Sequence, residues 1–511
     1  MATMRLIASK IGFILSLLVL TSCGRVVTEC GGMALNVNRL TQIQNAAFSS
    51  NSKAYLITPN PLDATGNVGL QSLDSALGSL LDSYFLPGLI LPSRLENSFL
   101  KVRINKITDS AGLLASPNSN GEFLFPISDI HYGETMAYHS LTAIQSYVEA
   151  LGFQTDKSRP FYVMVKAEGS THNPADVNAY YNHNPFSSSA PRELKIFGET
   201  AHSAWQDRDI FWHEFGHYFL ESLTGSRGVD QAGDAGAVFS EGGAIHECFA
   251  DYGAESLSGR GYLGRWIARN FPEYAVGQPL RTAHYKNDEF ENFREVIDFD
   301  SSGKNLDRYR LGEWCSRVLW DIREQIVSEN KVEGSFYADR MIFAAASLLK
   351  TDTSITDLKE SLLNADEELN CGIHSRSIQN AFESRGFSNE VKNLDNPLLF
   401  KGSVSWSPYS NEQSTRSFSV DFTITNTNSE LARNVRLVLE SPNGDFSPIV
   451  YEQAFGDLGS GKTVTVGVNG PIPIDYSVMG TIPANRNYKG IKIILRVKID
   501  NGPDTVIQGS L

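Results

Sequence analysis

The spacing of hydrophobic residues changes along the chain and predicts two kinds of structure in succession. Between residues 125 and 395, apolar residues recur at helical spacing in several long stretches, with short strand-like runs between them. After Lys401 the pattern becomes a series of short alternating or β-branched runs. We therefore expect a mixed helical and β unit followed by an all-β unit.

One helical stretch stands out in the first unit because its apolar residues are spaced so that much of the helix would be buried. It is predicted to be a buried helix on the spacing of Ile210, Phe211, Phe215, Tyr218, Phe219 and Leu223. Asp209 precedes these residues and suits the positive N-terminal end of such a helix. Other patterns predict a strand at Phe161–Val165 and helices at Phe336–Leu349 and Ile355–Asn364.

The segment before residue 125 predicts a small β-rich region. Residues 54–57 and 100–104 have the pattern of strands, and a loop-rich insert between them includes a helical stretch at Leu70–Leu81. Residues 24 to 50 have the character of a tether with some helix.

The C-terminal part, residues 399–511, predicts an antiparallel β-sandwich of the Ig-like type. Turn signals separate its predicted strands, as at Pro442-Asn443-Gly444, Gly459-Ser460-Gly461 and Asn501-Gly502. The strands themselves are predicted at 404–406, 418–425, 435–439, 463–468 and 491–499. The segment around Asn426-Thr427-Asn428 is similar to adhesion-type modules of secreted bacterial enzymes. We favour a spacer over a binding module, because no binding motif is evident.

Length and charge exclude some classes of function. A chain of 511 residues is expected to form about three domains. Its formal net charge is −14 and it has no run of lysine or arginine, which argues against a nucleic-acid partner. The oligomeric state and any calcium sites are not predictable from the sequence.

The N-terminus indicates export. Arg5 and Lys10 precede an apolar run at residues 11–20 that is too short to span a bilayer and suits a secretory signal. Because the run ends in Leu20-Thr21-Ser22-Cys23, it resembles a bacterial lipoprotein signal peptide, residues 1–22. On this interpretation Cys23 is acylated and anchors the protein to a membrane outside the cytoplasm, which is the outer membrane or cell surface in a Gram-negative organism.

The strongest chemical signal is His213-Glu214-Phe215-Gly216-His217. Histidines at i and i+4 lie on one face of a helix and can bind one zinc ion, and the glutamate between them can reach a water at the metal. Asp209 and the apolar residues around the motif support a buried helix at this site. A catalytic zinc site needs a third protein ligand and an open fourth position.

The third ligand is expected downstream, in the predicted helix that follows Ser240. Glu247 and Asp251 share one face of this helix, with Gly243, Ala244, Ala250 and Ala254 nearby. Small residues permit the close helix approach that a short carboxylate needs in order to reach a metal on its neighbour. Asp251 is then placed to accept the free ring N–H of a ligand histidine.

These residues resemble the gluzincin metalloproteases, the thermolysin and fungalysin group. The resemblance implies that His213, His217 and Glu247 bind one catalytic zinc, that Glu214 is the general base, and that Asp251 orients His213. It also implies a two-lobed catalytic domain over 125–398, after a tether and small β-rich region at 23–124. The chain as a whole is then a multidomain α+β protein.

The resemblance extends to both sides of the metal-binding helices. Asn178-Ala179-Tyr180-Tyr181 resembles the family's edge strand, so Asn178, Ala179 and Tyr180 are expected to bind the substrate backbone. Residues 194–198 resemble the next strand, and residues 136–153 the helix before the catalytic sheet. The stretch from Leu311-Gly312-Glu313-Trp314 through Leu319-Trp320-Asp321 is similar to a later fungalysin helix. The N-terminal region is shorter than the family's inhibitory propeptide, so no zymogen step is inferred.

The chain departs from the family pattern in two places. An insertion around residues 225–239 lengthens the gap from His217 to Glu247. The later family histidine that stabilises the oxyanion is absent, and Arg308-Tyr309-Arg310 stands in its place. We favour Tyr309 for this role, with Arg308, Arg310 and His284 as alternatives.

The remaining histidines and cysteines are interpreted as structural. His246 is expected to point away from the metal. His172, His183 and His202 lie in polar stretches near the predicted cleft and are expected to be exposed to solvent, with substrate contact as the alternative. Cys248 is expected to be buried or disulfide-bonded and not to bind metal. Its possible partners, with three pairings open, are Cys30, Cys315 and Cys371.

The expected function is hydrolysis of peptide or protein substrates by a lipid-anchored zinc endopeptidase. The alternative is a surface lipoprotein with a structural zinc site and an adhesive β-sandwich. An intact Glu214 favours the enzyme, because a structural site has no use for that carboxylate. The P1′ preference and the physiological substrate cannot be predicted.

Overall fold

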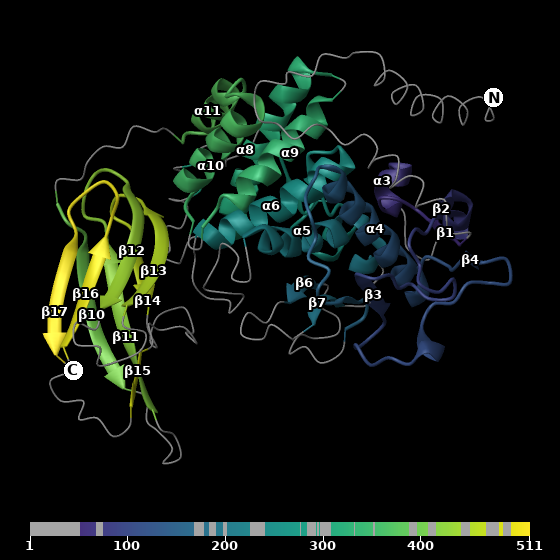
Figure 1. Cartoon of the computed structure of the whole chain (residues 1–511), viewed down its shortest axis with the longest axis horizontal. Helices are drawn as coiled ribbons and strands as arrows, with labels where there is room; N and C mark the ends of the chain where they lie inside the picture. The colour runs from purple at the N-terminus through teal and green to yellow at the C-terminus, as the bar shows by residue number, and fades with distance from the viewer. Residues whose placement is uncertain are drawn as a thin grey trace.

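The computed structural model describes the following residues: 52–67, 75–167, 178–182, 191–197, 202–224, 241–275, 277–283, 293, 296, 308–331, 333–350, 353–387, 396–406, 415–440, 450–466, 480–483 and 492–510. Figure 1 shows helices gathered in the middle of the chain and a separate group of long strands at the C-terminal end. Within the described residues, no helix combines the length and apolar character needed to cross a membrane.

The N-terminal part forms a small sheet beside the helices. Strand β1 (Lys53–Leu56) lies between the antiparallel β2 (Asp82–Phe85) and the parallel β4 (Glu122–Phe123). Its accessory elements are short: α3 (Pro61–Thr65), η2 (Ser75–Leu80) and η3 (Ala111–Leu113). The predicted helical stretch at Leu70–Leu81 therefore corresponds, where it is described, to a 3-10 helix.

A second sheet supports the site. Its strands run in the order β3 (Leu100–Arg103), β5 (Phe161–Met164), β7 (Arg192–Phe197) and β6 (Asn178–Asn182). The first three are parallel and β6 is antiparallel at the edge. Because β3 pairs with β5, the strand expected within the N-terminal region belongs to this sheet.

The long helices pack around a continuous hydrophobic core. They begin with α4 (Ile130–Ala150), α5 (Arg208–Thr224) and α6 (Glu241–Ser258), and continue with α8 (Arg308–Glu329), α9 (Gly334–Ser347), α10 (Ile355–Asn370) and α11 (Ser375–Ser384). Short elements join them: η4 (Ala204–Gln206), η5 (Ile267–Asn270) and the antiparallel pair of β8 (Tyr262–Leu263) and β9 (Arg281–Thr282). The helices predicted at 336–349 and 355–364 are α9 and the first part of α10.

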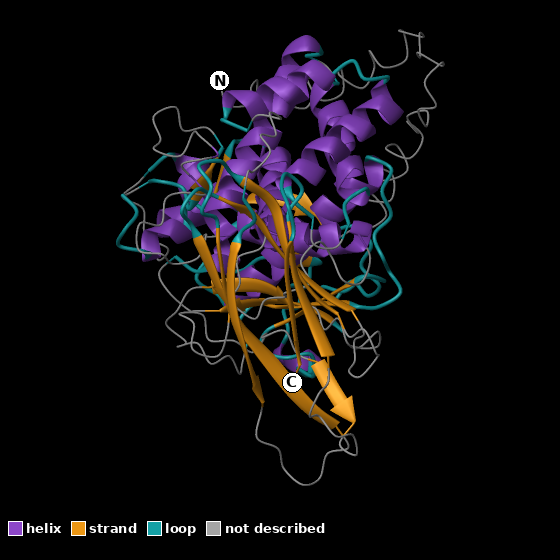
Figure 2. Cartoon of the chain, turned by 90° about the vertical axis from the view of Figure 1, so that its left-hand side faces the viewer, coloured by secondary structure: helices purple, strands orange, loops and turns teal. Residues whose placement is uncertain are grey.

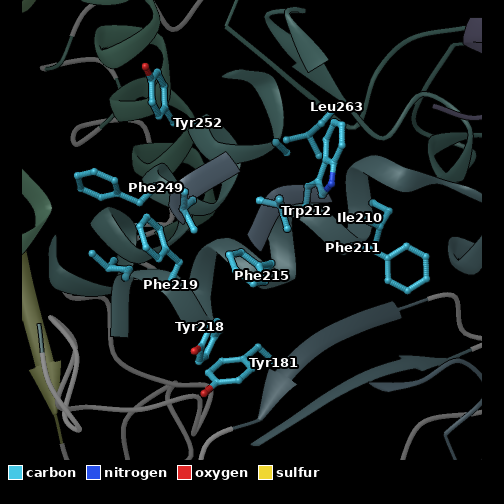
Figure 3. Packing of buried hydrophobic residues seen from close by; sticks show 14 of the residues in the cluster. Tyr181, Ile210, Phe211, Trp212, Phe215, Tyr218, Phe219, Phe249, Tyr252 and Leu263 are labelled. Atoms are coloured by element: carbon cyan, nitrogen blue, oxygen red, sulfur yellow. The ribbon is translucent and has the colours of Figure 1, made fainter. Parts of the chain in front are cut away.

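Aromatic side chains fix α5 against its surroundings. Figure 3 shows Phe215, Tyr218 and Phe219 on α5, with Tyr181 of β6 beside Tyr218. The rings of Tyr181 and Tyr218 lie 6.0 Å apart, and both are buried. On another face, Trp212 Nε1 donates a hydrogen bond of 2.8 Å to the Ser140 carbonyl of α4. These contacts place α5 between the sheet and α4.

The C-terminal strands form two antiparallel sheets (Figures 1 and 2). One contains β10 (Leu399–Trp406), β11 (Thr415–Thr425), β14 (Thr463–Val466) and β15 (Gly480–Pro483). The other has the order β13 (Val450–Leu458), β12 (Ala432–Glu440), β16 (Lys492–Lys498) and β17 (Thr505–Ser510). The predicted strand runs all fall on or overlap these elements, and the Ig-like arrangement stays a prediction.

Glycine at position 216 is required by the close crossing of α5 and α6. A Cβ atom at Gly216 would lie 2.6 Å from the Cα atom of Ala250, a backbone atom that cannot move aside alone. By contrast, a Cβ at Gly253 of α6 would meet nothing within 4 Å. The two glycines therefore differ in packing although both lie in the same helix pair.

We expect Gly216→Ala to destabilise the protein by about 1–3 kcal/mol, because it overpacks a helix contact. Gly253→Ala is the matched control and is expected to stabilise by about 0.5–1 kcal/mol through helix propensity. Chemical denaturation of the two full-length variants measures both values. Equal stabilities would contradict the packing argument.

Candidate active site

Helix α5 brings three polar side chains into a largely apolar interior. His213 and Glu214 are buried, and His217 is half-buried one turn further on. Asp209 in the first turn is also buried and forms an ion pair of 2.8 Å with Arg260. This pair anchors the start of the helix, so the positions of the histidines are fixed by packing and charge together.

Helix α6 supplies the facing carboxylates. Glu247 and Asp251 are both buried and lie one turn apart. The start of α8 approaches them closely: a Cβ at Gly312 would lie 2.6 Å from Glu247 Cβ and 3.0 Å from the Ala244 carbonyl oxygen. A disulfide between Cys248 and Cys315 joins α6 to α8 directly beside this contact. This is one of the pairings left open by the sequence.

The donor atoms of His213, His217 and Glu247 converge within 4.8 Å of one another. His213 Nε2 lies 3.2 Å from His217 Nε2 and 3.5 Å from Glu247 Oε2, and His217 Nε2 lies 3.8 Å from Glu247 Oε1. Tetrahedral zinc with ligand distances of about 2.0–2.2 Å places its donors roughly 3.3 Å apart. The arrangement therefore fits a zinc ion with two imidazole ligands and one carboxylate ligand.

Each histidine has a partner on its other ring nitrogen. His213 Nδ1 lies 2.8 Å from Asp251 Oδ1, the contact expected from the sequence. His217 Nδ1 lies 2.9 Å from His246 Nδ1, so one of these two nitrogens donates to the other. His246 does not join the three metal-donor residues, as expected, but its contact with His217 was not predicted. Because α6 crosses α5 closely, Glu247 faces the Nε2 side of His217 while His246 faces its Nδ1 side.

Arg281 of β9 is a site residue that the sequence patterns did not indicate. Its Nε lies 2.9 Å from Asp251 Oδ1, its Nη1 3.5 Å from Glu247 Oε2, and its Nη2 3.2 Å from His213 Nε2. The guanidinium thus lies against both α6 carboxylates and beside the metal donors. It lies on a two-residue strand that pairs with β8, and a strand this short has too few residues for a periodic signal.

Glu214 is held next to the donor set. Burial and the neighbouring Glu247 raise the pKa of Glu214 to about 7, although His213, Arg281 and a hydrogen bond from the Tyr181 backbone oppose the rise. Its Oε2 atom is buried and has no hydrogen-bond partner among the described residues. One oxygen is therefore tied to β6 and the other remains available for a water or substrate proton.

The residues expected to bind substrate lie on the edge strand β6. Asn178 is exposed, with its Oδ1 accepting a hydrogen bond of 2.9 Å from the Ala179 amide. The Tyr180 ring stacks on Phe197 at 5.2 Å. Because β7 pairs with only one side of β6, the outer side of this strand can pair with an extended peptide.

The candidates for oxyanion stabilisation have different surroundings. Tyr309 is exposed, lies 5.6 Å below the Arg281 guanidinium, and accepts a hydrogen bond of 3.0 Å from Arg308 Nη2. Arg310 lies in the first turn of α8, and His284 lies outside the described residues. Tyr309 and Arg308 are thus connected to the metal donors through Arg281.

The other residues named from the sequence are placed as follows. His202 is half-buried with its ring 4.8 Å from Trp266, in place of the solvent exposure expected. His172, His183, Cys23, Cys30 and the 225–239 insertion lie outside the described residues.

Two histidines and a glutamate on crossing helices, with a second glutamate beside them and an edge strand alongside, define a thermolysin-like zinc metallopeptidase. Residues 152–390 match the family model for fungalysin metallopeptidase (M36). The match supports a thermolysin-like zinc metallopeptidase over this part of the chain. The prediction of enzyme class and cofactor is confirmed.

Other comparisons add little. No curated protein matches the chain. One matching solved structure is that of catalytically inactive OgpA from Akkermansia muciniphila in complex with an O-glycopeptide substrate. It is 10% identical, and the match covers 40% of this chain and 51% of that chain with a TM-score of 0.15. A TM-score this low shows neither a shared fold nor a shared substrate.

The contact between His246 and His217 leads to a prediction about metal affinity. We expect His246→Leu to weaken zinc binding by about 10- to 100-fold, because His217 loses the partner that orients its ring. His246→Asn retains an acceptor at this position and is expected to bind zinc nearly as well as the native protein. Competition with a chromophoric chelator measures both affinities. Native affinity in the leucine variant would show that the contact does not orient the ligand.

Proposed function

We propose that the protein is a secreted, lipid-anchored endopeptidase in which His213, His217 and Glu247 hold the zinc and Glu214 is the general base. The observation that carries this proposal is the convergence of the three donors with the Glu214 carboxylate beside them. Asp251 and His246 orient the two histidines. A zinc ion held there would lower the pKa of a bound water toward neutrality and polarise the scissile carbonyl.

The protein residues then have separate tasks. Glu214 takes a proton from the attacking water through its free oxygen and delivers it to the leaving amine. Asn178, Ala179 and Tyr180 align an extended peptide along the outer side of β6 by backbone pairing. A cleavage site within a bound strand is compatible with endopeptidase action.

Negative charge that develops on the substrate carbonyl oxygen needs a donor. Tyr309 remains the candidate favoured from the sequence, and its ring lies against Arg281. Arg281 joins the candidates because its guanidinium is already beside the metal donors and keeps its charge at all relevant pH values.

Export and anchoring rest on the sequence and on one structural feature. The Leu20-Thr21-Ser22-Cys23 box after a short apolar run supports lipidation of Cys23. The Cys248–Cys315 disulfide supports an oxidising compartment outside the cytoplasm, because cytoplasmic thiols are kept reduced. Mass spectrometry of the purified N-terminus tests the acyl modification.

Glu214→Gln tests the general base. We expect this variant to keep its zinc, because Glu214 is not a ligand, and to lose turnover by about 10²- to 10⁴-fold or more. Zinc content is measured by elemental analysis and turnover with a quenched-fluorescence peptide library. Cleavage at the native rate would refute the assignment, and restoration of native activity by zinc after chelation is the companion control.

Tyr309→Phe and Arg281→Lys separate the two oxyanion candidates. Loss of an oxyanion donor is expected to lower kcat by about 10²- to 10³-fold with little change in KM. If Tyr309 is the donor, the phenylalanine variant shows this loss; if Arg281 is the donor, the lysine variant does. Unchanged kcat in both variants would exclude both residues from the role.

A further inference from the structure

Glu241, the first residue of α6, is a buried carboxylate at a junction of three segments. Its Oε2 accepts a hydrogen bond of 2.7 Å from the Ile355 amide at the start of α10. Its Oε1 accepts one of 2.7 Å from the Asp457 amide of β13. Glu241 lies six positions before Glu247 on the same helix, so it is outside the metal site.

The β13 segment is shaped to meet this carboxylate. Gly456 has a φ of 77°, and a Cβ there would lie 2.5 Å from Glu241 Cγ. The pairing of β12 with β13 is irregular at this point, next to Asn434, which also has a positive φ. A β-bulge of this kind re-aims backbone groups, here the Asp457 amide, out of the sheet.

Charges on the β side hold the amide in place. Asp457 is buried, and its Oδ2 receives a hydrogen bond of 2.6 Å from Arg433 Nη1 while its Oδ1 receives one of 2.8 Å from the Asn434 amide. The Arg433 guanidinium also lies 4.9 Å over the ring of Phe387, a core residue of the helical part. The C-terminal β unit, residues 399–510, is therefore joined to the helices by more than its chain connection.

The carboxylate suits its position electrostatically. It lies at the N-terminal ends of both α6 and α10, where unpaired amides and the helix dipoles favour negative charge. Burial and the neighbouring Asp457 nevertheless raise the pKa of Glu241 to about 8. Burial of this acid is energetically costly unless both of its oxygens accept hydrogen bonds. Because one amide comes from α10 and the other from β13, the two segments must lie in fixed positions relative to α6.

We propose that the C-terminal β unit contributes to the function of the peptidase. In this proposal Glu241 is a positioning residue: its contact with β13 fixes the position of α6, and α6 in turn fixes the position of Glu247. Helix α6 is fixed at two points. Glu241 holds its N-terminal end, and its middle is held against α8 by the close contact at Gly312 and by the Cys248–Cys315 disulfide. This proposal rests on the assignment of Glu247 as a zinc ligand. It differs from the spacer role favoured by the sequence.

Two pairs of full-length variants test the proposal. Gly456→Ala adds a methyl group on the β unit that would clash with Glu241. Gly461→Ala is its matched control, because Gly461 has a similar φ of 72° but an added Cβ there would have no atom within 4 Å. Glu241→Gln replaces one of two acceptor oxygens with a donor. Its control is Asp366→Asn, the same change at a buried carboxylate that accepts from the His374 amide within the helical part.

Zinc affinity is measured by chelator competition at a temperature where all four variants are folded, and kcat and KM are measured on one peptide. We expect Gly456→Ala and Glu241→Gln to weaken zinc binding by about tenfold, at the lower end of effects seen for residues behind metal ligands. Both should lower kcat more than they change KM. The control variants should stay within about twofold of the native affinity.

A purely structural junction would give a different result. It would lower the melting temperature of Gly456→Ala and Glu241→Gln while leaving the zinc Kd and kcat unchanged, and this would overturn the proposal. An effect of Glu241→Gln without one of Gly456→Ala would also overturn it, because the β unit would then not be involved. If the native protein cleaves no peptide but the zinc affinities still differ as expected, the peptidase mechanism fails and the positioning role stands.

Discussion

Helices α5 and α6 meet at Gly216 and Ala250 with almost no space between their backbones, and the chemistry of the site depends on that contact. A carboxylate side chain is short, so Glu247 reaches the histidines of α5 only if its own helix lies this close. Gly312 repeats the arrangement on the opposite side, where α8 packs on Glu247 itself. The candidate metal ligands are thus held between three helices whose separations are set by glycines and by one disulfide.

Local spacing explains why part of this site could be predicted from the sequence. The positions of His213 and His217 relative to each other depend only on the helical period, and the apolar residues around them indicate burial. Glu247 and Asp251 could be found because small residues accompany them on one helix face. The long C-terminal strands were also predictable, since their alternating and β-branched runs are bounded by turn residues.

The residues that were missed depend on geometry between elements. A helical period places His246 relative to Glu247, but it carries no information about the crossing angle that turns His246 toward His217. Arg281 lies in a two-residue strand with no periodicity of its own, and it reaches the site because β8 packs on α6 and β9 on α8. Glu241 and Asp457 are 216 positions apart in the chain, and nothing in either local pattern indicates that they meet.

Arg281 affects the charge balance of the site when the metal is absent. Around the donors, Glu214, Glu247 and Asp251 supply three acidic groups in a buried space, and Arg281 supplies one fixed positive charge against them. A divalent cation bound there would add two positive charges beside these carboxylates and so reduce the excess negative charge of the buried site. Without the ion, the site must instead take up protons or admit water, because uncompensated charge in a low-dielectric interior is costly. Binding of the ion should therefore stabilise the whole helical interior, in addition to supplying the reactivity of the site.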